Sequence, residues 1–147
     1  ISLGFLCLRI YNNLYDNIMF VKIPSIKENV SVVESFIENV GEKIRIEEAI
    51  YGNVLVPVTE AVNNAIVHGN KEDKNKKVRL GLKQNKKSVR FIVEDEGMGF
   101  DHNTLPDPTN PKNLEKVKGR GIFLIKSLSD KTTFKQGGRV VEMLFKL

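Results

Sequence analysis

The stretch EAVNNAIVHGN, residues 60–70, places a carboxylate and two adjacent asparagines inside an apolar, helix-like pattern. Asparagine is a mediocre helix former because its amide competes for nearby backbone hydrogen bonds, so a second task has to be considered. Glu60 and Asn64 are four residues apart, and a helix would project both from one face, one turn apart. Such a pair can ligate or orient a hard cation such as Mg²⁺, or hold a water molecule. On this motif alone, a surface pair without function explains the pattern equally well.

A second candidate is DEGMGF, residues 95–100, which follows a strand-like segment. Asp95 stands at the predicted end of the strand, and Gly97 and Gly99 come directly after it. Glycine permits positive φ and lets a ligand or another backbone approach closely. A carboxylate beside such open backbone can accept a hydrogen bond from an exocyclic amine, as adenine offers. The alternative is an ordinary turn, because Asp and Gly are common turn formers.

The third candidate is KGRGIFL, residues 118–124. Gly119 and Gly121 directly precede an apolar helical pattern, so free N–H groups and the helix dipole are expected to face the preceding loop, a geometry that binds phosphate. Lys118 and Arg120 add positive charge at the same place. The spacing is neither that of a Walker loop nor that of a Rossmann fingerprint. A glycine-rich helix start without a ligand remains the alternative.

Two long helices are predicted in the first half of the chain. Ser25 and Glu28 have the spacing of a capping box, and the apolar stripe that follows should end at Gly41. A second helix should run from about residue 46 to residue 68. Because Pro57 lies inside it, a kink or two abutting helices are expected.

Alternating apolar residues predict strands near residues 19–23, 78–82 and 89–93, and a closing hairpin over 131–147 that turns at Gly137 and Gly138. A third helix is expected over residues 121–130. The segment 96–120 lacks any period and holds three of the five prolines, which is typical of a functional loop such as a lid. The predicted fold is α+β, a two-layer α/β sandwich. Its sheet should be mixed, mostly antiparallel and of four or five strands, with about three helices on one face.

Composition indicates a globular protein of one domain. The chain has 147 residues, of which 41% are hydrophobic and 28% charged. Cys7 is the single cysteine, which excludes an internal disulfide and fits a reducing, cytoplasmic compartment. No apolar run is long enough to cross a bilayer. Met19 is expected to be the natural start, with residues 1–18 an upstream extension or else an extra strand or arm.

The net charge of +5 comes largely from a basic cluster over residues 71–87. Such a cluster can attract nucleic acid or an acidic protein. Aromatic residues do not interleave the basic ones, as base stacking would require. A solubilising hairpin is therefore favoured, and direct nucleic-acid binding is disfavoured.

The order of the three motifs is more specific than any one of them. A helix with Glu and Asn, a strand ending in Asp-x-Gly-x-Gly, a long loop and a Gly-x-Gly segment would supply the metal site, the nucleotide-base site, the lid and the phosphate site, respectively. In this order the chain from residue 19 to 147 resembles the GHKL (Bergerat-fold) ATPases. Among them it is most similar to the bacterial anti-sigma factor serine/threonine kinases. EAVNNAIVHGN resembles their N box, VEDEGMGF their first glycine box and GRGIFLIKSLSD their second.

The resemblance implies a role for each motif in binding ATP and Mg²⁺. Glu60 would be the general base, which accepts a proton from a serine hydroxyl or from water. Asn64 would hold Mg²⁺ through its side-chain oxygen. Asp95 would accept a hydrogen bond from the amine of adenine, while Gly97 and Gly99 would leave space for the adenine ring. The phosphates would meet Lys118, Gly119, Arg120 and Gly121.

The resemblance also implies partners and leaves an alternative. The protein would transfer the ATP γ-phosphate to a serine of a STAS-type anti-sigma factor antagonist and would sequester a sigma factor, as a cytoplasmic homodimer without membrane contact. The alternative is a nucleotide-dependent binding switch without kinase activity; Glu60 favours the kinase, since a pure sensor needs no base. The chain departs from the family after its last glycine pair, where Arg139, Val140 and Val141 stand in place of frequent threonines, which affects one minor adenine contact.

Overall fold

Within the residues that the computed structural model describes (9–13, 16–99 and 117–147), six strands form one sheet in the order β1-β2-β3-β4-β6-β5 and three α-helices pack against it. The strands are β1 (Arg9–Asn13), β2 (Asp16–Pro24), β3 (Lys77–Gln84), β4 (Ser88–Glu94), β5 (Lys131–Lys135) and β6 (Val140–Lys146). The α-helices are α1 (Val30–Ile44), α2 (Glu48–Asn64) and α3 (Val117–Leu128). Short helical turns occupy Lys27–Asn29, Ala65–Gly69 and Gln136–Gly138.

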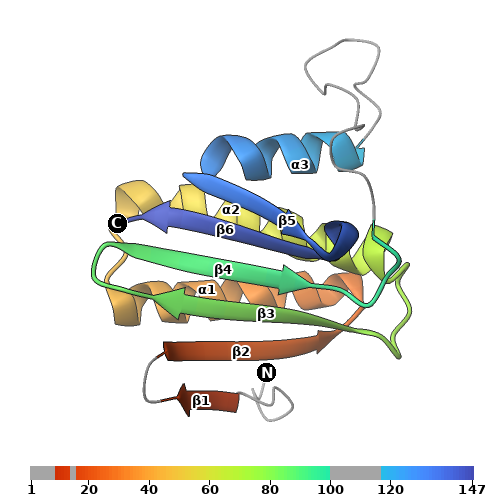
Figure 1. The fold of residues 1–147 in the computed structure, drawn as a ribbon, viewed down its shortest axis with the longest axis horizontal. Helices are drawn as coiled ribbons and strands as arrows, with labels where there is room; N and C mark the ends of the chain where they lie inside the picture. The colour runs from red at the N-terminus through yellow and green to blue at the C-terminus, as the bar shows by residue number, and fades with distance from the viewer. Residues whose placement is uncertain (1–8, 14–15, 100–116) are drawn as a thin grey trace.

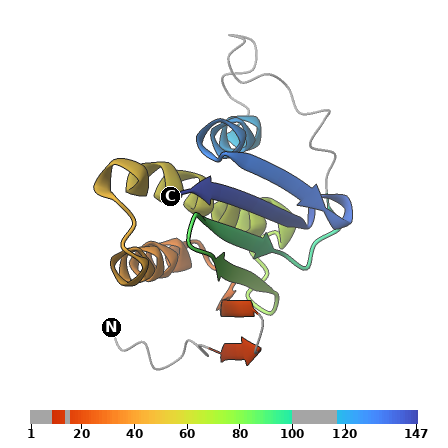
Figure 2. The ribbon, with the colours of Figure 1, turned by 60° about the vertical axis from the view of Figure 1, so that its left-hand side comes forward.

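The helices and the sheet make two layers (Figure 1). α1 and α2 run behind the central strands and contact each other, and α3 packs against α2 and reaches β5 at the edge of the sheet. The turned view separates the helical layer from the strands (Figure 2). This arrangement confirms the α+β sandwich predicted from the sequence.

The sheet differs from the prediction in strand number and in direction. It has six strands rather than four or five, because β1 pairs with β2 and β2 already begins at Asp16. Each pairing between the described strands is antiparallel, so this sheet is not mixed. The short connections explain the direction of the pairs β1–β2, β3–β4 and β5–β6, since a parallel pair needs a long crossover. The pairs β2–β3 and β4–β6 are antiparallel although long segments join their strands.

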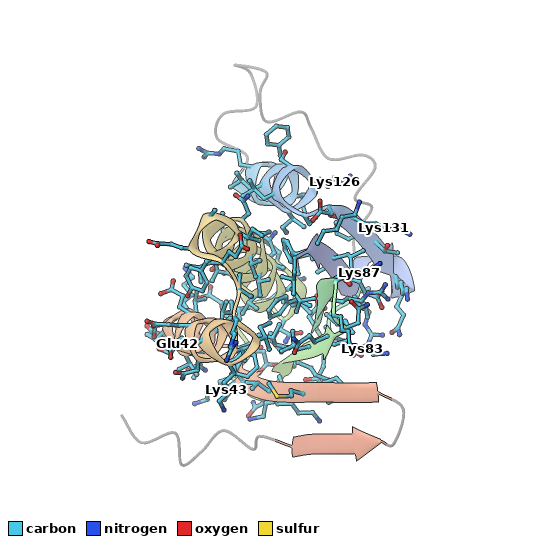
Figure 3. The ribbon with its side chains drawn as sticks, turned by 90° about the vertical axis from the view of Figure 1, so that its left-hand side faces the viewer. Glu42, Lys43, Lys83, Lys87, Lys126 and Lys131 are labelled. Carbon is cyan, nitrogen blue, oxygen red and sulfur yellow. The ribbon has the colours of Figure 1, made fainter. Side chains whose placement is uncertain are left out.

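One face of the sheet is buried beneath the helices. Strand alternation sends the apolar residues of β3 and β4 to this face, as predicted, and those of β6 lie there too. They meet the apolar stripes of α1 and α2. The largest fully buried side chains include Phe91, Phe145, Ile37, Ile66, Leu80 and Ile125. The other face is open, and Lys83 and Lys131 lie on that side, away from Glu42 on α1 (Figure 3).

The predicted capping box at the start of α1 is wrong. Ser25 is buried, and its Oγ donates to the carbonyl of Lys76 at 2.7 Å; neither Lys27–Asn29 nor α1 has a side-chain cap. The chain passes through the turn Lys27–Asn29, and α1 begins only at Val30. The hydroxyl that the local spacing assigned to the helix therefore bonds to a residue distant along the chain.

Gly41 also does not end α1. It is buried inside the helix, where a Cβ atom would lie 3.3 Å from Tyr51 Cε2 of α2, so it allows the two helices to approach. The helix ends at Ile44, and Arg45 follows in the left-handed conformation with φ 57°. The end of α1 is thus displaced from the glycine that predicted it, because that glycine serves packing.

α2 continues through Pro57 as one helix, so two abutting helices do not form there. The proline ring is buried in the core-facing side of the helix. Directly after Asn64 the chain widens into a π turn over Ala65–Gly69, which completes the helical segment predicted to end at about residue 68. Such π turns occur frequently at functional sites.

Candidate functional site

Glu60 and Asn64 lie one turn apart on the face of α2 that meets α3. A Cβ atom built on Gly121 of α3 would lie 3.0 Å from Glu60 Oε2 and 3.1 Å from Asn64 Nδ2. The carboxylate and the amide therefore share one face, as their spacing predicted, and Gly121 lets α3 approach both. Asn64 is 9% exposed, and its Nδ2 has no hydrogen-bond partner in the described part of the chain. A buried amide in this condition is costly, and a ligand would relieve the cost.

Asp95 is held in place by the sheet rather than by a flexible loop. It is 7% exposed, and its Oδ1 accepts a hydrogen bond from the backbone N–H of Gly97 at 2.7 Å. Its own backbone N–H donates to the carbonyl of Arg139 at 3.0 Å, which extends the β4–β6 ladder one step beyond the pair Glu94–Val140. The carboxylate therefore has a fixed position where β4 ends.

Gly97 and Gly99 are required by the close approach of two other backbone segments. A Cβ atom on Gly97 would overlap the carbonyl oxygen of Gly69 at the end of the π turn. A Cβ atom on Gly99, which has φ +82°, would overlap the carbonyl oxygen of Gly137 in the turn between β5 and β6. The loop after Asp95 is thus enclosed between the end of one helical segment and one turn of the sheet.

A pocket connects these motifs. It lies between α2, α3 and the sheet, and its apolar lining is Ala61, Ala65, Val93, Ile122, Ile125, Phe134 and Val141. Its polar lining is Asn64, His68, Asp95 and Arg139, with Gly69, Gly99 and Gly138 completing it. Apolar walls with a few convergent polar groups are typical of a site for a small molecule or cofactor. Asn64 belongs both to this pocket and to the contact between Glu60 and Gly121, so it joins the two regions.

The third motif lies inside a helix, not before one. The described part of α3 starts at Val117, so residues 119–121 are already helical. Both glycines of the motif are buried, and Arg120 is exposed. Lys118 lies in the first turn, but its side chain is outside the described residues. The predicted lid falls mostly on residues 100–116, which also lie outside them.

Asn70, which the sequence does not mark as a site residue, organises the segment beside the pocket. Asn70 is 1% exposed; its Nδ2 donates to Ser25 Oγ at 2.8 Å and to the carbonyl of Lys77 at 3.0 Å. Its Oδ1 accepts from the backbone N–H of Glu96 at 2.7 Å. These bonds tie the end of the π turn to β2, β3 and the loop after Asp95. Local sequence patterns give no signal for partners so distant along the chain.

We expect Asn70→Ala to lower the free energy of unfolding by roughly 2–4 kcal/mol, because it leaves several buried polar groups without partners. Urea denaturation followed by circular dichroism measures the change. The matched control is Asn39→Ala on the exposed surface of α1, which should stay within about 0.5 kcal/mol of the wild type. A loss of stability no larger than that of the control would show that Asn70 does not hold the loop.

The donor set around Asn64 is of the kind that suits a hard cation. Within residues 9–13, 16–99 and 117–147, no group of three His, Cys, Asp or Glu side chains is placed to hold a metal ion. Mg²⁺ commonly takes only one or two protein ligands and completes its shell with water and phosphate oxygens. An amide oxygen of Asn64 beside the carboxylate of Glu60 is compatible with that mode. Over the same residues, none of the helices combines the length and the apolar character needed to span a bilayer.

Comparison with known proteins agrees with this geometry. The family model of the histidine kinase-like ATPase domain matches residues 23–145. The chain is also similar to serine-protein kinase RsbW of Staphylococcus aureus strain JH9, with 26% identity over 131 residues that cover 84% of this chain and 82% of the relative. The protein of the same name from strain Newman matches equally, with 26% identity over the same share of each chain. The matched region contains α2, β4 and α3 and thus all three motifs, and the chain belongs to the histidine kinase-like ATPase domain family.

Proposed function

We propose that this protein is an ATP-binding serine/threonine kinase of the anti-sigma type, which transfers the γ-phosphate of ATP to a serine of an antagonist protein. The observation that carries the proposal is the meeting of Glu60, Asn64 and Gly121 beside a pocket that also contains Asp95. Membership of an ATPase family supports the nucleotide. The relatives are serine-protein kinases by name, which supports the class of acceptor.

The pocket suits an adenine nucleotide. Ile122, Ile125 and Phe134 offer apolar surface to a planar base, and the buried carboxylate of Asp95 would accept from its amine. Gly99 leaves the pocket wall without a side chain on this side. The phosphates would then extend from the base toward Asn64 and the first turn of α3, where free N–H groups and the helix dipole favour anions.

Asn64 fits the role of a magnesium ligand. Its Nδ2 is buried without a hydrogen-bond partner, and a 180° rotation of the amide would place its oxygen in the same position. Bound Mg²⁺ neutralises charge on the phosphates of the nucleotide. Asn64 would contribute one ligand to the ion and would keep it on the face of α2 that carries Glu60.

Glu60 would act as the base of the transfer. Its carboxylate takes the proton of the acceptor serine while the serine oxygen bonds to the γ-phosphorus and the bond from phosphorus to the oxygen of ADP breaks. Phosphoryl transfer depends mainly on positioning and on charge neutralisation, and one turn of helix separates Glu60 from the metal ligand Asn64. A protein that only sensed nucleotide would need no base at this position.

The proposal includes the partners and the setting of the reaction. The antagonist would be a STAS-type protein, and the kinase would also sequester a sigma factor and thereby regulate transcription. We assign the nucleotide site to one domain that includes residues 19–147; β1 and the first residues of β2 extend the sheet of that domain rather than standing apart from it. We also propose a cytoplasmic homodimer. The match of the family model to residues 23–145 supports the single domain.

The direct test is a transfer assay. The protein is incubated with magnesium and γ-labelled ATP together with candidate STAS-type antagonists from its own genome. We expect label on a serine of one antagonist, identified by mass spectrometry of the modified protein. Nucleotide binding without label on any antagonist would contradict the kinase and would favour the binding switch.

We expect Gly121→Ala to separate activity from stability. The added methyl group would lie 3.0 Å from Glu60 Oε2, so the carboxylate must shift, and transfer should fall by roughly tenfold or more. Alanine is a better helix former than glycine by about 1 kcal/mol, so the melting temperature should not fall. Gly52→Ala in α2 is the matched control, since a Cβ there would meet nothing within 4 Å. Equal transfer rates for the two variants would show that α3 does not position Glu60.

A further inference from the structure

Arg139 is the turn residue that directly precedes β6, and its carbonyl lies opposite the backbone N–H of Asp95. The hydrogen bond from the Asp95 N–H to the Arg139 carbonyl continues the β4–β6 register, in which Val93 pairs with Val141 two residues away. Arg139 has helical backbone angles (φ −71°, ψ −24°), so strand alternation does not fix its direction. Asp95 and Arg139 nevertheless both line the pocket, as do Val93 and Val141 of the adjoining strands.

The side chain of Arg139 carries an unused donor in this position. Its Nε is buried and has no hydrogen-bond partner in the described part of the chain, and the residue lines the pocket. Arg79 offers a comparison, since its Nε is also buried without a partner. The Arg79 guanidinium, however, lies 3.8 Å from the ring centroid of Phe20 and 3.9 Å from Glu94, and the residue does not line the pocket.

Opposed in this way, an acceptor and a donor can recognise the edge of a base. A carboxylate accepts hydrogen bonds, and a guanidinium only donates them. Together they complement an edge that carries an amine next to a ring nitrogen with a lone pair, which adenine presents on both sides of its amine. We infer that Arg139 is a base-recognition residue, whose guanidinium donates to a ring nitrogen of the base next to the amine that Asp95 accepts. This inference rests on the proposed nucleotide site.

The test compares the wild type with Arg139→Met by calorimetry, using ATP, adenosine, and the 1-deaza and 7-deaza analogues of adenosine. We expect Arg139→Met to weaken the binding of ATP and of adenosine alike, by about tenfold, as for one hydrogen bond from a charged group. The affinity of the wild type should fall by a similar factor for one deaza analogue, the one that lacks the contacted nitrogen. The variant and the wild type should bind that analogue with equal affinity, because the contact is absent from both complexes.

Two further variants allow the role of Arg139 to be tested even if Arg139→Met folds poorly. Arg139→Lys retains the charge without the planar donor fork, so it should bind adenosine more weakly than the wild type while its melting temperature is preserved. Arg79→Met, the matched control, should leave affinity for both nucleotide and nucleoside unchanged.

Three results would overturn the role of Arg139 alone: unchanged affinity in the variants, a loss for ATP but not for adenosine, or equal further losses on both deaza analogues. The second result would place the contact at the phosphates, and the third would make the role structural. Failure of the wild-type protein to bind ATP would instead refute the nucleotide site itself, and the inference with it.

Discussion

Glu60→Gln should lower the rate of phosphate transfer to the antagonist by about 10²–10⁴-fold, the usual contribution of a well-placed general base. Glutamine keeps the length and shape of the side chain beside Gly121, but it cannot take the proton of the serine hydroxyl. Because Glu60 does not line the pocket, the affinity for ATP should change little. Single-turnover transfer assays with labelled ATP measure the rate, and calorimetry measures the affinity.

A matched control for this prediction is Glu38→Gln, an exposed change on α1, which should transfer at the wild-type rate. If the Glu60→Gln protein transfers phosphate as fast as this control, Glu60 is not the general base. If Glu60→Gln lowers both the affinity for ATP and the rate of transfer, Glu60 acts in nucleotide binding rather than as the base. Only the loss of rate with affinity retained agrees with the proposed role.

The second large effect is expected for Asp95→Asn, which should weaken ATP binding by roughly 10–100-fold, as expected when a charged hydrogen-bond acceptor is lost. One carboxylate oxygen accepts from the Gly97 N–H at 2.7 Å. Asparagine can preserve that bond only by placing its NH₂ group where the second oxygen stands, so a donor would face the amine of the base. Competition binding with a fluorescent adenine nucleotide measures the change.

Asp130→Asn is the control for Asp95→Asn. Asp130 is exposed and accepts from the Lys146 N–H at 2.7 Å through one oxygen, a bond that asparagine can also accept, and it does not line the pocket. Its substitution should leave ATP affinity unchanged. If Asp95→Asn also binds ATP normally while its melting temperature is unchanged, the adenine contact lies elsewhere in the pocket.

The elements that depend on local spacing were predictable from the sequence. The four-residue spacing of Glu60 and Asn64 placed both on one face of α2, and Gly121 meets both. The alternation of Val89, Phe91 and Val93 identified the buried face of β4, and each is at most 1% exposed. Periodicity succeeds here because burial of one face decides both the element and its orientation.

The errors concern residues whose partners are distant along the chain. The hydroxyl of Ser25 bonds to Lys76 rather than to a helix, and Gly41 accommodates Tyr51 instead of ending α1. α3 includes Gly119 and Gly121 because packing against α2 overrides the low helix propensity of glycine. In each case a tertiary contact outweighs a local preference.

Some polar residues around the pocket could likewise be identified from the sequence, and others could not. Asp95 could be selected because it precedes two glycines at a strand end. Asn70 could not be assigned, because its partners Ser25 and Glu96 lie 45 and 26 residues away. Arg139 was visible only as a departure from the family pattern, and the β4–β6 register is what places it opposite Asp95.

The central claim is that Mg·ATP binds in the pocket between α2, α3 and the carboxyl end of β4. The most direct test is a titration of the wild-type protein with ATP in the presence of magnesium, followed by calorimetry and by melting temperature. At ATP 100-fold above its Kd, binding to the folded state should add about 2.7 kcal/mol of stability and raise the melting temperature by roughly 5–10 °C. Absence of binding heat together with an unchanged melting temperature at millimolar nucleotide would contradict the account.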